Sequence, residues 1–256
     1  MTTAHWPICT FAGLAAATLA GCAIQPGRPT VTETPLPAVG RFSAAKPGEA
    51  LPSGWEVWKL SGLKRRTEYR LVDYGGRTVL FAHARGSASG LVFPTSIDPR
   101  AYPLIQWRWN VSALISGADN TKRHLEDSPA RIVIAFEGDR RKLPIEERIF
   151  ADQFKAFTKQ EFPYAVLMYI WENHAPVGTV IDNPHTSRIK MIVADSGYAN
   201  VGTWREKTRN VYEDFKRAFG EEPARIQSVG IMTDTDNTGA DAVGFYGDIS
   251  VAASKP

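Results

Sequence analysis

Apolar and polar side chains alternate with a period of two along most of the chain, a pattern typical of half-buried β-strands. The segment 105–111 shows it most sharply, because Trp107 and Trp109 share one face with two aliphatic residues and polar residues occupy the other face. Segments of this kind, separated by turn residues, predict strands at 69–72, 78–82, 105–111, 131–136, 165–171, 188–193, 225–232 and 243–251.

Two segments carry apolar residues at helical spacing instead. The first begins after Pro144, a favourable residue next to a first helical turn, and the second ends before Gly220, a common residue just past a helix end. The apolar positions are Ile145, Ile149, Phe150, Phe154 and Phe157 in the first segment and Trp204, Val211, Phe215 and Phe219 in the second. Many short strands with two helices predict a mainly β fold, namely an antiparallel β-sandwich in its jelly-roll form with two added helices.

The first 21 residues contain no Lys, Arg, Asp or Glu, and residues 11–19 form a short apolar run. Such a run is too short to span a bilayer and is typical of a secretory signal. The sequence Leu-Ala-Gly-Cys at 19–22 resembles the bacterial lipoprotein box, in which the cysteine thiol receives the lipid. We therefore expect a signal peptide at 1–21 and lipidation at Cys22; an ordinary signal peptide with an incidental cysteine is the alternative.

The second cysteine, Cys9, lies inside the expected signal, so the mature chain would keep one thiol with no disulfide partner. Lipidation accounts for that single thiol, and several acyl chains together anchor a protein stably to a membrane. Ala23 follows Cys22, whereas Asp at that place is associated with retention at the inner membrane in proteobacterial lipoproteins. The expected location is therefore the bacterial cell envelope, on the periplasmic face of the outer membrane.

The region after Cys22 has few large apolar residues and five prolines, at 26, 29, 35, 37 and 47. This composition predicts an extended tether over residues 22–50. No internal repeat or second linker follows, so we expect a single domain at 51–252 and a short tail at 253–256. The chain has 30 Lys+Arg and 27 Asp+Glu, a net charge of +3, which gives no electrostatic reason to expect a nucleic-acid partner.

Several motifs, spread in order along the chain, carry a resemblance to a known family. They are TEYRLV at 67–72, SASGL at 87–91, WRW at 107–109, Asp127 with Ala130 and Arg131, Tyr169 with Trp171, FG at 219–220, MTDTDNT at 232–238 and YGDI at 246–249. Together they resemble the bacterial domain-of-unknown-function family 3047. The resemblance implies a secreted or lipid-anchored bacterial protein with a fold similar to galactose-binding jelly rolls, and it implies no particular activity. Where the family is associated with two adjacent aspartates, this chain has Glu126 and Asp127.

The two faces of the 105–111 strand have different expected roles. Trp107 and Trp109 lie among aliphatic residues, which is the composition of a sandwich interior, although paired tryptophans also form carbohydrate-stacking platforms. We expect them in the core, which leaves Arg108 and Asn110 on a polar face where a ligand could meet the sheet. If it is exposed, Trp171 is a further candidate for stacking against a ligand.

Arg131 shares a strand face with apolar residues, so we expect it to be partly buried and to need a carboxylate partner. Glu126 and Asp127 lie just before it in the sequence, and Arg108 could join them from a neighbouring strand. Two interpretations stay open at this point. One is a structural ion-pair network, and the other is a groove in which the guanidinium fork binds an anion or a sugar.

The loop that begins at Asp234 is the densest source of oxygen ligands in the chain. Asp234, Asp236 and Thr238 resemble the opening of a calcium loop, and Asp241 lies just beyond them. The match is incomplete, because an aromatic residue stands where the twelfth position of such a loop needs Glu. Three hypotheses stay open: a hairpin loop whose side chains bond their own backbone, a Ca²⁺ site, and direct contact with an organic ligand.

The catalytic motifs that we tested are broken or absent in the sequence. The segment 86–90 (Gly-Ser-Ala-Ser-Gly) lacks the central nucleophile of a Gly-x-Ser-x-Gly elbow, and the histidines show no zinc-binding spacing. We therefore expect an envelope lipoprotein whose β-sandwich binds a glycan or another polyol without catalysis. The alternatives are a hydrolase of an envelope polysaccharide and a scaffolding lipoprotein that binds another envelope protein. The expected ligand-binding residues are Arg108, Asn110, Glu126, Asp127, Arg131, Trp171, Asp234, Asp236 and Asn237.

Overall fold

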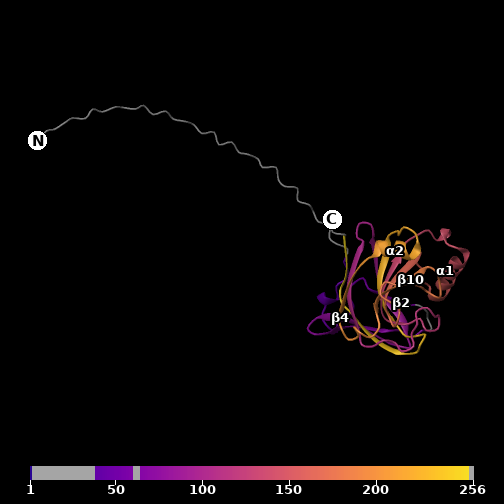
Figure 1. Ribbon diagram of the computed structural model, residues 1–256, viewed down its shortest axis with the longest axis horizontal. Helices are drawn as coiled ribbons and strands as arrows, with labels where there is room; N and C mark the ends of the chain where they lie inside the picture. The colour runs from indigo at the N-terminus through magenta and orange to yellow at the C-terminus, as the bar shows by residue number, and fades with distance from the viewer. Residues whose placement is uncertain (2–37, 60–63, 254–256) are drawn as a thin grey trace. The chain divides into compact units, whose positions relative to one another are not determined.

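Two seven-stranded β-sheets pack face to face in the computed structural model, which describes Met1 and residues 38–59 and 64–253 (Figure 1). Sheet A contains, in spatial order, β1 (Ala38–Gly40), β14 (Ile249–Ala252), β6 (Leu104–Val111), β13 (Asp241–Tyr246), β4 (Thr78–Arg85) and β3 (Glu68–Asp73), and β11 (Arg205–Asn210) pairs with β6. Sheet B contains β2 (Glu56–Lys59), β5 (Ala88–Ile97), β12 (Ile226–Asp234), β7 (Ser128–Phe136), β8 (Ala165–Glu172), β10 (Ile189–Ser196) and β9 (Val180–Asp182). The strand pairs are antiparallel except for β8 and β10, which run parallel.

Two α-helices and two short 3₁₀ helices join the strands in the described residues. They are α1 (Ile145–Thr158), α2 (Val211–Phe219), η1 (Phe42–Ala44) and η2 (Arg140–Lys142). Helix α1 follows Pro144 as predicted, and α2 ends at Gly220, whose φ of 71° lies in the left-handed region that glycine tolerates. The predicted start of the second helix was too early, because 205–210 forms β11 along an edge of β6 and Trp204 lies before that strand.

The core lies between the two sheets and is rich in aromatic rings. Trp107 on β6 stacks on Tyr169 of β8 with ring centroids 5.0 Å apart, and Trp109 contacts Trp171 across the same interface at 6.2 Å. All four side chains are buried. The predicted core position of Trp107 and Trp109 is therefore correct. The predicted class is confirmed too: a mainly β, jelly-roll-type sandwich with two added helices.

A second apolar cluster covers the outer face of sheet B. The same alternation that sends Ile132 of β7 into the core sends Val133 outward, where it joins Met168 and Met191 of the neighbouring strands. Helix α1 packs onto this face through Ala151 and, more peripherally, through Phe150 and Phe154. This packing places α1 against the outer face of sheet B and creates the concavity described below.

The folded part begins earlier than the sequence predicted. Strand β1 pairs with β14, and Phe42 is fully buried in the core beside Trp55, with ring centroids 5.3 Å apart. The predicted tether at 22–50 therefore extends too far, because the pairing of β1 and the burial of Val39 and Phe42 dock this segment on the domain. The signal peptide, apart from Met1, and the lipidation site Cys22 lie outside the described residues.

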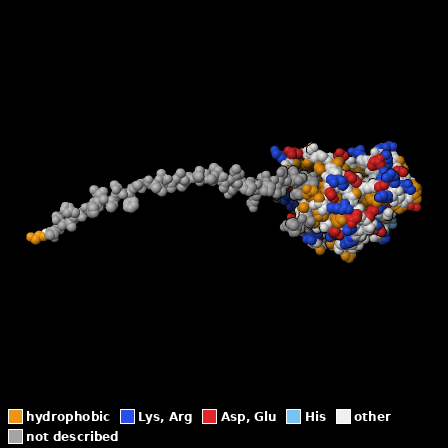
Figure 2. All heavy atoms as spheres, turned by 90° about the horizontal axis from the view of Figure 1, so that it is seen from above, with side chains coloured by type: hydrophobic (Ala, Val, Ile, Leu, Met, Phe, Trp, Pro, Cys, Tyr) orange, Lys and Arg blue, Asp and Glu red, His pale blue; other side chains and the backbone are white. Residues whose placement is uncertain are grey.

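Other differences from the predicted strands are local. The predicted strand 243–251 is two strands, β13 and β14, separated at Gly247 and Asp248. Strands β1, β2, β5, β9 and β11 were not predicted, since they are short or lack a regular alternation. Within the described residues no helix has the length and hydropathy needed to cross a bilayer. On the face of the domain seen in Figure 2, basic and acidic side chains are interspersed.

Candidate functional site

A cavity of about 190 Å³ opens on the outer face of sheet B beneath α1, and we call it the α1 pocket. Its floor comes from β7, β8, β10 and β12, and its walls come from α1, β2 and the segments that carry Lys64, Glu126, Phe162, Asn183, His185, Asp236 and Asn237. One group of lining residues is apolar: Trp58, Phe150, Phe154, Phe162, Met168, Ile189 and Met232. The other group is polar: Lys64, Glu126, Arg131, Asn183, His185, Asp234, Asp236 and Asn237.

Arg131 lies at the polar end of the pocket and is 1% exposed. Its Nε donates to Oδ1 of Asp234 at 2.7 Å, and its Nη2 donates to Oδ2 of the same carboxylate at 3.0 Å. Its Nη1 donates to Oε1 of Glu126 at 2.8 Å. A bidentate pair and a second carboxylate satisfy the guanidinium, as a buried arginine requires. The predicted burial and carboxylate partnership of Arg131 are correct, and Asp234 is the additional partner.

The charges of this network shift the pKa values of its members. Burial raises the pKa of Asp234, and the nearby Glu126 and Asp127 raise it further, against the lowering effect of Arg131. Burial acts to lower the pKa of Arg131, but Asp234 and Glu126 outweigh it and raise that pKa above its usual value. Arg131 therefore stays charged, and the network depends on it to hold two carboxylates away from water.

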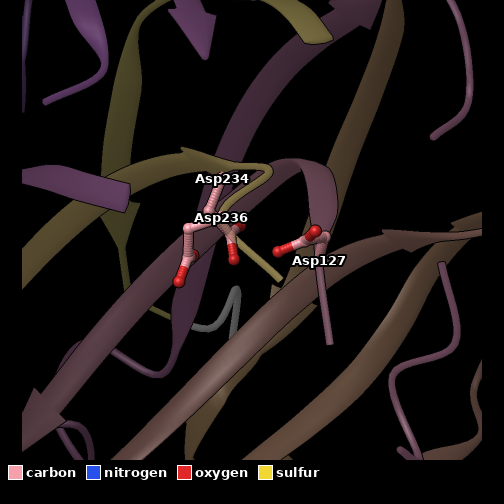
Figure 3. A group of neighbouring side chains, drawn as sticks. All are labelled: Asp127, Asp234 and Asp236. Atoms are coloured by element: carbon pink, nitrogen blue, oxygen red, sulfur yellow. The ribbon is translucent and has the colours of Figure 1, made fainter. Parts of the chain in front are cut away.

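Asp127 organises the loop that follows β12 (Figure 3). Its carboxylate accepts hydrogen bonds from the backbone N of Thr238 at 2.7 Å and of Asn237 at 3.3 Å. The Nδ2 of Asn237 in turn donates to the carbonyl of Glu126 at 2.9 Å. These bonds join two segments that are more than a hundred residues apart in the sequence, so the predicted residues of both segments meet at one site.

The predicted set of calcium ligands is brought together only in part. One carboxylate oxygen each of Asp127, Asp234 and Asp236 lies within 4.8 Å of the others. Thr238 offers its amide to Asp127, whereas the side chain of Asp241 is 64% exposed and pairs with His83 on sheet A. The prediction of Asp241 as a ligand beside Asp234 is therefore wrong, because β13 carries it to the other sheet.

The oxygens of this acidic cluster already have partners. Asp234 accepts from Arg131, Asp127 accepts from turn amides, and Asp236 pairs with Lys64. These partners match the ion-pair network, one of the interpretations left open by the sequence, whereas the loop amides are held by Asp127 from another segment and not by the loop's own Asp and Asn side chains. The arrangement favours this network over a cation site.

Three predicted ligand-binding residues lie elsewhere. Trp171 is fully buried in the core, where its Nε1 donates to the carbonyl of Gly197, so no ligand can stack on it. Asn110 is buried and donates to the carbonyl of Gly202 at 3.0 Å. Arg108 lies on the outer face of sheet A and does not meet the Arg131 cluster on sheet B. The sequence did not reveal that β6 and β7 belong to different sheets.

The aromatic wall of the α1 pocket was not predicted as a site. Phe150 and Phe154 both pack against Phe162, with ring centroids 5.2 Å apart in each pair. Their spacing of four residues indicated a helix face but not what that face covers. Trp58 lies over Gly90, where an added Cβ would be 3.3 Å from the indole ring and 2.9 Å from the carbonyl of Ile231. A glycine at this position lets the ring approach the sheet.

Among the residues that line the pocket, carboxyl groups outnumber cationic side chains by one. Three carboxylates (Glu126, Asp234 and Asp236) face two cations (Arg131 and Lys64) among its lining residues. Burial lowers the pKa of His185, although Glu126, 3.9 Å away, acts to raise it. His185 is therefore neutral at neutral pH, and the pocket offers mainly hydrogen-bond acceptors.

The sequence model of a known family matches residues 53–250, a range that includes every residue lining the α1 pocket. That family is described as "Protein of unknown function (DUF3047)". The chain belongs to this family. The resemblance inferred from the motifs is thereby confirmed, and membership in DUF3047 brings no activity with it. No curated protein is significantly similar to the chain.

Solved structures similar to this DUF3047 member include two carbohydrate-binding modules from cellulosomal cellulases of Clostridium thermocellum. The family 11 module is 11% identical, with a TM-score of 0.41 and coverage of 85% of this chain and 96% of that one. The family 30 module is 9% identical, with a TM-score of 0.41 and coverage of 78% and 92%. The xyloglucanase domain of NopAA from Sinorhizobium fredii, in complex with cellobiose, is 9% identical, with a TM-score of 0.43 and coverage of 83% and 100%. All three TM-scores are below 0.5, so the ligand class is inferred from the α1 pocket and not from these structures.

Proposed function

We propose that the α1 pocket binds a short polyol segment, such as one or two rings of a neutral glycan. The observation that carries this proposal is the division of the pocket into an aromatic wall, with Trp58 and Phe154, and an acceptor-rich wall around the buried Arg131 network. Sugar rings have apolar C–H faces that pack on aromatic rings, and hydroxyl groups that donate to carboxylates and amides. Such a ligand would use both walls.

The size and charge of the pocket support the same ligand class. Its volume of about 190 Å³ is smaller than the roughly 300–1,000 Å³ of sites for drug-sized ligands, so the bound segment is short. Because the cations among the lining residues do not outnumber the carboxyl groups and are already paired with them, the pocket offers an anionic ligand no free positive charge. The donors of Arg131 are already used, so its role in the proposal is to hold Glu126 and Asp234 in place for the ligand.

The placement of the carboxylates supports binding without cleavage. Glycoside hydrolysis needs two carboxyl groups that flank the bond, about 5–9.5 Å apart. Here Asp127, Asp234 and Asp236 form one cluster, and each is already held by a cation or by backbone amides. A well-formed cavity also favours a ligand-binding domain over a scaffold with a flat apolar surface.

The Trp58→Ala variant is the direct test of this site. The loss of one stacking ring is expected to weaken glycan binding about tenfold, which corresponds to about 1.4 kcal/mol. Ligands are first identified on a glycan array, and their affinities are then measured by isothermal titration calorimetry. The matched control is Tyr198→Ala, because Tyr198 is 69% exposed and outside the pocket. Equal affinity of Trp58→Ala and wild type would contradict the proposed site.

The proposed location is the cell envelope, with a lipid on Cys22 that holds the protein at the periplasmic face of the outer membrane. The support is the Leu-Ala-Gly-Cys sequence at 19–22 and the absence of another cysteine after it. Cys22→Ser is expected to move the protein from the membrane fraction to the soluble fraction. Cys9→Ser, a change within the signal, is the control and should leave the protein in the membrane fraction. If Cys22→Ser stayed in the membrane fraction, the proposed anchoring would be contradicted.

A further inference from the structure

A second concavity, of about 260 Å³, lies on the outer face of sheet A, the side of the sandwich opposite the α1 pocket. We call it the Arg108 pocket. It forms where β13 ends and β14 begins, so that the ladder beside β6 is interrupted at residues 247–248. Its lining includes Arg77, Arg108, Glu206, Lys207, Thr208 and Ser250.

The backbone and one aromatic ring hold Arg108 in place. Gly247 donates its N–H to the carbonyl of Arg108 at 2.9 Å, and an added Cβ at Gly247 would lie 2.4 Å from Cγ of that arginine. The guanidinium carbon of Arg108 lies 4.5 Å from the ring centroid of Trp204, a cation–π contact. The guanidinium is therefore oriented before any ligand arrives.

Arg108 differs from the other cations of this pocket because it forms no ion pair with any residue in the described part of the chain. Arg77 pairs with Asp248 at 3.0 Å, and Lys207 pairs with Asp195 at 2.7 Å. The guanidinium of Arg108 makes no hydrogen bond or ion pair with any residue that the structure describes, and its Nε is buried. Glu206 lies opposite Arg108 in the β6–β11 register but forms no ion pair with it.

The electrostatic environment makes an anion favourable here. Burial lowers the pKa of Arg108, and the nearby Arg77 lowers it further, against the effects of Asp248 and Glu206. An oxyanion beside the guanidinium groups of Arg77 and Arg108 would offset the repulsion between these two positive charges. It would also accept hydrogen bonds from the free N–H groups of the Arg108 guanidinium. The hydroxyl groups of Thr208 and Ser250 line the same space and add further donors.

We propose that the Arg108 pocket binds a small oxyanion, the carboxylate of a sugar acid or a phosphate group, with Arg108 as the recognising residue. Its preference is then opposite to that of the α1 pocket, whose lining carries more carboxylates than cations. The two sites lie on opposite sheets and depend on different residues. The oxyanion site therefore stands whether or not the α1 pocket binds a glycan.

The test is a calorimetric titration of the purified protein with three probes: glucuronate, inorganic phosphate and neutral glucose. We expect glucuronate, phosphate or both to bind, with affinity that falls as sodium chloride is added, and the two anions distinguish the carboxylate source from the phosphate source. Arg108→Gln should weaken the binding at least tenfold. Arg70→Gln is the matched control, because Arg70 lies on the same sheet but is already paired with Glu68 and stacked on Phe81.

Three results would overturn the proposal. They are no binding of either anion to the wild type, an equal weakening of glucose binding and anion binding in Arg108→Gln, or unchanged anion affinity in Arg108→Gln. Thermal unfolding checks that this variant is folded. Arg108→Lys provides a second readout, because it keeps the charge, loses the planar fork and should bind the anion more weakly than wild type but more tightly than Arg108→Gln.

Discussion

Replacing Arg131 with Met is expected to lower the free energy of unfolding by about 3–5 kcal/mol, the usual effect of removing one partner from a buried ion pair. The substitution leaves Glu126 and Asp234 buried without the guanidinium that holds both. Chemical denaturation at pH 7 measures the loss. The difference in unfolding free energy between wild type and Arg131→Met should become smaller at low pH. The pKa of Asp234 is already raised by burial, so its unpaired carboxyl group can take up a proton there and lose its charge.

The control for this prediction is Arg70→Met on the surface of sheet A. Arg70 pairs with Glu68 at 3.1 Å, and both side chains are more than half exposed. Exposed pairs contribute only about 0–1 kcal/mol, so this variant should remain close to wild type. A loss of less than about 1 kcal/mol in Arg131→Met would show that the buried network contributes no more to stability than an exposed ion pair.

Phe42→Ala is expected to lower the free energy of unfolding by about 3–5 kcal/mol, although the sequence pattern placed this residue in a tether. Phe42 is 0% exposed and packs on Trp55, so its truncation leaves a cavity in the core. Thermal and chemical unfolding of wild type and Phe42→Ala measure the difference in stability. A protein that begins at residue 51 should lose at least as much stability, because it also lacks β1.

Phe157→Ala provides the matched control, the same substitution at a side chain that is 79% exposed on α1. Exposed substitutions of this kind usually change stability by no more than about 0.5 kcal/mol. If Phe42→Ala were as stable as Phe157→Ala, residues 38–50 would not belong to the folded domain.

The parts of the fold that the sequence predicted are those with a regular period. Residues 105–111 of β6 alternate between apolar and polar, so the burial of Trp107 and Trp109 follows from their spacing. Helix α1 begins after Pro144 as expected. The position of Phe42 was not predictable in this way, because Val39 and Phe42, the two large apolar residues between Pro37 and Pro47, show no regular period. Its burial depends on the pairing of β1 with β14, in which Ala38 lies opposite Ser250 from the far end of the chain.

The candidate site was predictable only where neighbours in sequence are neighbours in space. Glu126 is five residues from Arg131, and the need of a buried arginine for a carboxylate made that pair predictable. Asp234 reaches Arg131 because β12 pairs with β7, a register that the sequence alone does not show. The aromatic wall depends on how α1 packs over sheet B, so Phe154 was recognised as a helix residue and not as part of a pocket.

The most direct test of the central claim is a two-dimensional NMR titration of the protein with a glycan selected on the array. We predict that the largest shifts occur at the Trp58 indole and at the amides of Asn183 and His185, which line the α1 pocket. The anomeric signals of the glycan should remain unchanged in number after prolonged incubation, because it is bound and not cleaved. Shifts confined to residues away from the α1 pocket, or new anomeric signals from a shortened glycan, would contradict the account.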